Sequence, residues 1–241
     1  HRARIKALTI LGETGFCHGQ LAEAKSRMEE AEQLARNLGT TQTVIWALCQ
    51  QSEISIAQGY LQRAYNLQDK ALQYAQERQL EELPLTEFIY RIRSQVLWEW
   101  YRLDGAEQAC HRGLQILNGR DEHLKLQCLI LQAKIAQSRG QKERSQQLIE
   151  QIQKLLQGQD YHSDWLANAH ATLLSYWDSC GDHQAIEAWL ADAPDLAEPD
   201  LATPTNHFAQ CHARNRARAY TSLGRCRQAI ELLNRIQQEA V

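Results

Sequence analysis

Proline and glycine are scarce in this sequence of 241 residues, which has only 4 Pro and 12 Gly. Few stretches favour strands, since long segments are written in Ala, Leu, Gln, Glu, Arg and Lys, the straight-chain residues that favour helices. Hydrophobic residues make up 44% and charged residues 23%, a composition compatible with a folded core. We therefore expect an all-α fold.

Long hydrophobic runs are also missing. No segment approaches the roughly 18 to 20 apolar residues that span a bilayer, and the start does not resemble a signal peptide. We expect a cytoplasmic protein with no membrane partner. Because the sequence starts at His1 without a methionine and is already in a helical pattern, and ends at Val241, we expect a piece of a larger protein.

An excess of positive charge and the common catalytic motifs are absent as well. The formal charge of −3 leaves no basic surplus to neutralise phosphates, so we expect no direct contact between this segment and nucleic acid. The sequence has no P-loop, dinucleotide-binding, zinc-protease or nucleophile-elbow signature and no C-x-x-C pair. These absences predict a segment that is not an enzyme and holds no cofactor.

The seven cysteines are odd in number, widely spaced and placed inside helical patterns. This distribution favours free thiols in a reducing compartment over a disulfide framework. They are Cys17, Cys49, Cys110, Cys128, Cys180, Cys211 and Cys226.

A short pattern recurs along the whole chain: a turn residue, four variable residues, and then usually a small one. The predicted turn residues are Gly19, Gly59, Asp104, Gly140, Gly181 and Gly224, at spacings of 40, 45, 36, 41 and 43 residues. Helical periodicity precedes and follows each turn, and glycine suits the left-handed conformation in which many helices end. The repeat therefore predicts about six antiparallel helix pairs.

Small residues should let the two helices of each pair approach closely. They recur five residues after the turn (Ala24, Ala64, Ala109, Ser145 and Ala229) and seven before it (Gly12, Ser52, Ala133 and Ala217). The pattern resembles the tetratricopeptide repeat, although its period of about 41 exceeds that family's 34. We expect a single superhelical domain over residues 1–241, with a Pro-rich loop near 193–205 between the fifth and sixth pairs.

Residues at matching offsets before each turn should form rows on the concave face, which the first helices of such stacks line. In the second and third pairs these rows bring together Trp46, Gln50, Glu53, Arg91, Gln95 and Trp98, and Arg102 should extend the third-pair stripe by a turn. Aromatic rings with planar amides and charged groups suit a neutral polyhydroxylated ligand. Arg93 lies off the rows and is expected to bridge adjacent pairs.

Other interpretations stay open for these residues. Polar groups on an inner face are often only solvated, tryptophans often fill gaps between repeats, and the same groove could hold a peptide or a partner helix. Asp164 and Trp165 form a second candidate rim. His207, Cys211 and His212 are the nearest approach to a metal site, but no second cluster lies near them in sequence, and we expect no metal.

Four segments are more specific than a generic helical repeat. They are QQSEISIAQGYLQRAYNLQDKA (50–71), LPLTEFIYRIRSQVLWEWYRLDGAE (83–107), QGQDYHSDWLANA (157–169) and NHFAQCHARNRARA (206–219). Together they cover about a third of the chain and resemble the sensor domain of the MalT family of maltose transcription activators.

The resemblance implies an activator of the signal-transduction ATPase class. Such a regulator has an N-terminal module that binds ATP or ADP, a helical superhelix that senses maltotriose, and a C-terminal helix-turn-helix for DNA. It also implies that the parent protein self-associates and that this segment contacts the other modules. The 241 residues correspond to the superhelix alone, and the resemblance does not say which residues touch sugar.

Overall fold

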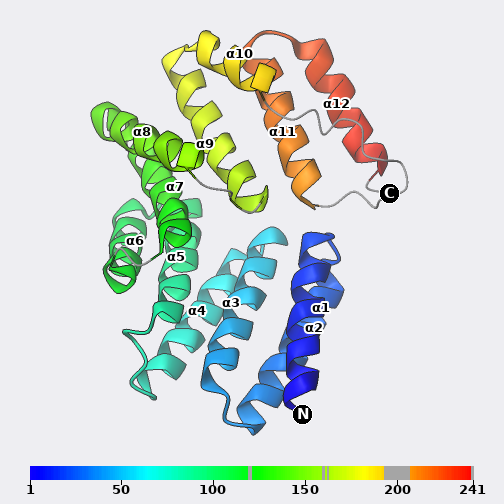
Figure 1. Ribbon diagram of the computed structural model, residues 1–241, viewed down its shortest axis with the longest axis vertical. Coiled ribbons are helices and arrows are strands. Elements are labelled where there is room, and N and C mark those ends of the chain that lie inside the picture. The colour runs from blue at the N-terminus through cyan, green and yellow to red at the C-terminus, as the bar shows by residue number, and fades with distance from the viewer. Residues whose placement is uncertain (119–120, 159–160, 162, 193–206, 240–241) are drawn as a thin grey trace. The chain divides into compact units, whose positions relative to one another are not determined.

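The computed structural model describes residues 1–118, 121–158, 161, 163–192 and 207–239 (Figure 1). The chain divides into two compact units, His1–Arg139 and Gly140–Val241, and each is described by itself. All regular structure in the described ranges is helical, which confirms the all-α prediction. None of the described helices is long and apolar enough to cross a membrane.

The described residues of unit 1 form seven helices, of which the odd-numbered ones are the first helices of pairs. The first helices α1, α3, α5 and α7 contact one another in sequence, and each second helix packs between its own first helix and the next one. The bounds are α1 Arg2–Cys17, α2 Leu21–Asn37, α3 Thr41–Ala57, α4 Leu61–Gln76, α5 Pro84–Glu99, α6 Leu103–Leu117 and α7 Glu122–Ser138.

The described residues of unit 2 form five helices, with α9 and α11 side by side and α10 and α12 following them as second helices (Figure 1). The bounds are α8 Lys142–Gly158, α9 Ser163–Cys180, α10 His183–Asp192, α11 His207–Ser222 and α12 Cys226–Glu239. The Pro-rich segment expected as a loop near 193–205 lies outside the described residues.

The predicted turn glycines adopt the backbone conformation that their sequence positions indicate. Gly19, Gly59, Gly140, Gly181 and Gly224 all have φ between 67° and 79°, the left-handed region in which a Cβ is penalised. At Gly59 the amide N–H donates to the Ile56 carbonyl, and the next N–H donates to the Ser55 carbonyl. These bonds satisfy carbonyls at the helix end that would otherwise lack a donor.

The third turn lies three residues before the predicted one. Tyr101, with φ of 57°, occupies the left-handed position, and its N–H and that of Arg102 donate to Trp98 and Leu97 in the same pattern as at the glycine turns. Asp104 is instead the second residue of α6, so its assignment as the turn residue was wrong. A search for glycine or aspartate misses this turn because a tyrosine fills it.

The corrected register makes the second and third pairs equivalent. Ser52 donates its hydroxyl to the carbonyl of Ala64 at 3.0 Å, and Ser94 donates to Ala106 at 2.8 Å. Each serine lies seven residues before its turn and each alanine five after. The close approach predicted from small residues is confirmed in the first pair too, where a Cβ built on Gly12 would lie 2.8 Å from Met28 Cε.

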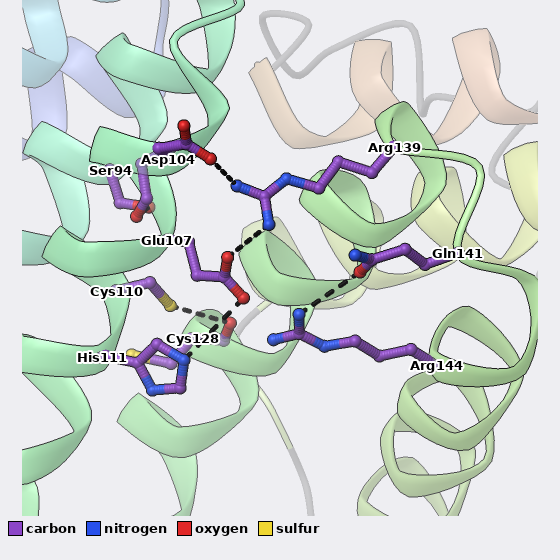
Figure 2. A network of polar contacts seen from close by, with 10 residues as sticks. Ser94, Asp104, Glu107, Cys110, His111, Cys128, Arg139, Gln141 and Arg144 are labelled. Atoms are coloured by element: carbon purple, nitrogen blue, oxygen red, sulfur yellow. Dashed lines mark hydrogen bonds and ion pairs between the residues drawn. The ribbon is translucent and has the colours of Figure 1, made fainter.

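Asp104 has a different role in the structure. Together with Glu107, also on α6, it forms ion pairs with Arg139, the residue that follows α7 (Figure 2). The half-buried Arg139 side chain thus connects the start of α6 to the end of α7 in unit 1.

In unit 2 a histidine pair lies where α9 meets α11. His170 contacts His212 with ring centroids 5.8 Å apart and Trp189 of α10 at 5.5 Å. Burial, reinforced by His212, lowers the pKa of His170 from 6.5 to about 4. The imidazole is therefore neutral in the folded chain at pH values where the unfolded chain already binds a proton.

This difference predicts an acid-dependent loss of stability. Above pH 6.5 the neutral His170 side chain does not lower the free energy of unfolding. As pH falls from 6.5 toward 4, the unfolded state binds more protons than the folded state, so the free energy of unfolding decreases, by up to about 3 kcal/mol in total. Urea unfolding at pH 7 and pH 4.5 should show a steeper decline for wild type than for His170→Phe, which keeps an aromatic ring beside Trp189. Equal declines would contradict the assignment.

The turn geometry predicts opposite effects for two glycine-to-alanine substitutions in unit 1. Gly59→Ala should destabilise by about 1 kcal/mol, because φ is 79° although a Cβ there meets no atom within 4 Å. Gly105→Ala, in the first turn of α6 where φ is not positive, should stabilise by about 0.5 kcal/mol, with the new Cβ 3.4 Å from the flexible end of Leu97. Chemical denaturation measures both, and a change of the same sign in the two variants would refute the argument.

Candidate functional site

A chain of side-chain contacts crosses the first helices of unit 1. It starts on α1, where Glu13 accepts a hydrogen bond from Trp46 Nε1 of α3 at 2.8 Å. The Trp46 ring stacks on Phe88 of α5, with centroids 5.0 Å apart and planes 15° apart. Three successive first helices are thereby connected through one indole ring.

Arg91 continues this chain of contacts as a buried cation. Its guanidinium lies 4.3 Å from the Phe88 ring centroid, and its side chain is only 9% exposed. Nη2 is 3.5 Å from Glu53 Oε1 on α3, and Nε is 3.8 Å from Glu87 Oε1 one turn back on α5. Burial alone would lower the pKa of Arg91, but the two carboxylates hold it above its ordinary value.

Glu87 is the most deeply buried acid of the group, with a fully buried side chain. Burial raises its pKa, and Arg91 opposes that shift. Cys128 of α7 lies with Sγ 3.5 Å from Oε1, and Oε2 has no hydrogen-bond partner among the described residues. Glu87 therefore depends on Arg91 for most of the compensation of its charge.

A cleft of about 450 Å³ opens beside Trp46, on the side of the first helices. It is lined by Thr9, Gln42, Thr43, Trp46, Leu83, Pro84 and Leu85, from α1, α3 and the start of α5. The volume lies in the range of small-molecule sites, and an aromatic wall with a few polar groups is their usual lining. The exposed Gln42 provides both donor and acceptor atoms at the rim.

The predicted rows of the third pair shift by three residues with its turn. Phe88, not Arg91, is the counterpart of Trp46, and Gln95 is the counterpart of Glu53. The structure does bring Trp46, Glu53 and Arg91 into one contact network. Gln50 is buried on α3, and Gln95 is half-buried on α5.

The contacts of Trp98 favour a packing role over a place in an open groove. Its Nε1 donates to Ser138 Oγ at 3.0 Å, and Lys134 Nζ lies 5.2 Å from the ring centroid, so it contacts α7. The half-buried ring also packs against the hydrophobic cluster formed by Leu97, Ala106, Ala109 and Ile135.

The structure tests the separate predictions made for Arg93 and Arg102. Arg93 bridges adjacent pairs as predicted, since it contacts Asp69 and Tyr65 of α4. Arg102 does not extend the α5 stripe, because α5 ends at Glu99 and Arg102 is the N-cap of α6, 5.1 Å from the Trp100 ring centroid. That part of the row assignment was wrong for the same reason as the turn.

The second candidate rim and the weak metal candidate lie in unit 2. Trp165 is half-buried on α9, whereas the side chains of Asp164 and His207 lie outside the described residues. Cys211 is half-buried and His212 is buried beside His170. Within the described part of the chain, no three His, Cys, Asp or Glu side chains gather as a metal site would require.

Comparison with known proteins connects this arrangement to a family. The model of the MalT-like TPR region matches residues 1–241. The HTH-type transcriptional regulator MalT of Vibrio cholerae is 43% identical over the whole chain, and that of Yersinia enterocolitica is 41% identical over 99% of it. The chain belongs to the MalT-like TPR family.

The MalT-like TPR chain spans about a quarter of the length of these relatives, 26% in each case. Its fold is shared with solved repeat proteins at low identity. BtubC from P. vanneervenii gives a TM-score of 0.63 at 17% identity, with 83% of each chain covered. The kinesin light chain of Podosopora anserina with nearly identical TPR-like repeats gives a TM-score of 0.53 at 15% identity, over 100% of this chain and 96% of the other.

The sequence analysis did not identify three residues of the contact network in unit 1 as site residues: Glu13, Glu87 and Phe88. A usable signal existed, because Leu and Ala follow the turn at two and five residues in Gly19-Leu21-Ala24 and Gly59-Leu61-Ala64. The same pair, Leu103 and Ala106, follows Tyr101. Aligning on it would have placed Phe88 opposite Trp46.

The buried ion pair gives a direct stability prediction. Arg91→Met should destabilise unit 1 by about 3 to 5 kcal/mol, because Glu87 is left buried without its counter-charge. Adding Glu87→Gln should restore a large part of the loss, since the amide carries no charge. Chemical denaturation of both single variants and the double variant measures the coupling, and strictly additive losses would contradict it.

Proposed function

We propose that this chain is the ligand-sensing regulatory region of a transcription activator and that it binds maltotriose, or a related malto-oligosaccharide, in the cleft beside Trp46. Membership of the MalT-like TPR family supports the regulatory role. The single observation that carries the site is the cleft of about 450 Å³ that joins α1, α3 and α5 around an indole ring. A binding role without catalysis is part of the proposal.

The lining of this cleft suits a neutral sugar. The C–H faces of glucose units pack against aromatic rings, and their hydroxyls exchange hydrogen bonds with amides and hydroxyls. Trp46 supplies the ring, while Gln42 and Thr43 supply polar groups within one turn of it. Leu83, Pro84 and Leu85 form an apolar wall from the start of α5.

The same cleft offers a physical route from binding to regulation. A ligand there touches three first helices, whose relative positions are fixed by Trp46, Phe88 and Arg91. A sugar that prefers one spacing of these helices shifts the population toward it, by no more than its difference in affinity for the two states. Trp46 is thus both the wall of the site and a contact of the network.

A further part of the proposal concerns the modules of the full-length parent protein. We propose that it carries an N-terminal module that binds ATP or ADP and a C-terminal helix-turn-helix that binds DNA. In the same proposal, sugar binding favours its self-association. The relatives bear the name HTH-type transcriptional regulator, and this chain corresponds to about a quarter of each.

Thermal unfolding with maltotriose tests the proposal. At about 100 times its dissociation constant a ligand adds roughly 2.7 kcal/mol to the free energy of unfolding. For a chain of 241 residues, this increase raises the melting temperature by about 5 to 10 °C. Glucose at the same concentration and an unrelated peptide serve as comparison ligands, and calorimetric titration gives the affinity.

Variants at the rim locate the site without disturbing the ionic network. Gln42→Ala and Thr43→Val should each weaken maltotriose binding by roughly 5-fold or more, because each removes about one hydrogen bond. Gln73→Ala, an exposed glutamine on α4 that pairs with Glu77, is the matched control and should bind as wild type does. Equal affinity in all three variants would remove the site from this cleft.

The alternative to a sugar sensor is a scaffold that holds a peptide or partner helix in the same groove. Failure of maltotriose to shift the melt of this chain, followed by failure with the full-length parent, would favour that scaffold. A shift with the parent alone would instead show that the sugar site needs another module.

A further inference from the structure

Unit 2 has a second cleft, between α9 and α11, with a different chemical character. Its volume is about 340 Å³, and it is lined by Ala167, Asn168, Ala171, Cys211, Arg214, Asn215 and Arg218. The two helices lie side by side along it (Figure 1). None of the seven lining residues is acidic, whereas two are arginines.

The two arginines share one face of α11, because they are four residues apart. Arg218 is exposed, and its Nη1 donates to the Ala171 carbonyl of α9 at 3.3 Å, which holds the guanidinium at the cleft. Arg214 is exposed and forms no ion pair with a described residue. The sequence of α11 contains no aspartate or glutamate that could neutralise either charge from its own helix.

Six other arginines of the chain have a carboxylate partner. Arg36, Arg63, Arg112 and Arg139 in unit 1, and Arg225 and Arg227 in unit 2, all pair with a carboxylate. Arg214 and Arg218 thus differ from these six in facing a cleft without a described carboxylate on them.

The floor of the cleft is fixed. Asn215 is buried, and its Nδ2 donates to the Ala167 carbonyl at 2.7 Å, which ties α11 to α9 between the two arginines. The side chains of Ala167 and Ala171 are single methyl groups, so α9 leaves room for a ligand beside the guanidinium groups, while the backbone carbonyls of both residues accept from Asn215 and Arg218. Asn168 adds an amide one position along.

We propose that this cleft binds a small molecule through a phosphate-monoester group. Two guanidinium groups match the charge of a phosphate dianion, and the planar fork of each can donate two parallel N–H bonds to its oxygens. The volume accommodates a single small molecule and lies at the lower end of the range for such sites. The site is separate from the sugar cleft of unit 1, so either can fail without the other.

Calorimetric titration of the 241-residue chain with glucose 6-phosphate tests this assignment, at constant ionic strength set with sodium chloride. Inorganic phosphate, glucose and succinate are titrated alongside. Binding of both phosphate compounds and none of glucose is the expected result. Binding of succinate without glucose 6-phosphate would overturn the phosphate assignment, and so would no binding of either phosphate compound at millimolar concentration.

Matched arginine variants separate a built site from general attraction. Arg214→Gln and Arg218→Gln should each weaken glucose 6-phosphate binding by roughly ten-fold or more, because each removes a charge-assisted contact. Arg227→Gln removes an equal charge from α12, where the side chain is 92% exposed, and should change affinity less than two-fold. Equal losses in all three variants would overturn the proposal.

Cysteine alkylation gives a second readout at the cleft itself. Cys211 lines it, whereas Cys226 is exposed on α12 and outside it. Glucose 6-phosphate should slow the reaction of Cys211 with iodoacetamide and leave that of Cys226 unchanged, as peptide mass spectrometry can count. Binding without selective protection of Cys211 would place the ligand elsewhere and overturn the assignment.

Discussion

In unit 1 the helix pairs α1–α2, α3–α4 and α5–α6 each reverse at a residue held at positive φ, and the position of every first-helix side chain can be counted back from that residue. The left-handed turn fixes which side chains of the first helix face the next pair. A shift of three residues in one turn therefore exchanges Arg91 for Phe88 opposite Trp46. The network Glu13, Trp46, Phe88, Arg91, Glu53 and Glu87 exists only in the register that Tyr101 sets.

Much of the architecture could be predicted from periodicity and glycine alone. Five of the six turns fall at the predicted glycines, and small residues such as Gly12 and Ser52 lie where paired helices touch. The remaining turn, the third along the chain, could not be found by residue type, because tertiary context holds Tyr101 at a positive φ that a tyrosine disfavours. Its hydroxyl donates to the Ser138 carbonyl of α7, a contact invisible in a repeat pattern.

The candidate site was predictable in part, for a physical reason. Offsets from a turn tell which residues share a face, but the predicted offset of Arg91 was counted from Asp104. Arg91 still joins the network of Trp46 and Glu53, because it contacts Glu53 and the Phe88 ring. Offsets do not tell how deep a side chain lies, which depends on neighbours from distant pairs. Arg91 and Gln50 turned out to be buried and Trp98 to contact α7, while the cleft takes its polar rim from Gln42 and Thr43 one turn earlier.

In the proposed mechanism, one network of first-helix contacts both positions a sugar cleft and responds to its occupant. Hydrogen–deuterium exchange of the chain with and without maltotriose tests it most directly, because exchange reports local opening segment by segment. Protection should rise along α1, α3 and the start of α5, around Thr9, Trp46 and Leu85, and should be unchanged in α12. Protection confined to unit 2, or none at a saturating sugar concentration, would contradict it.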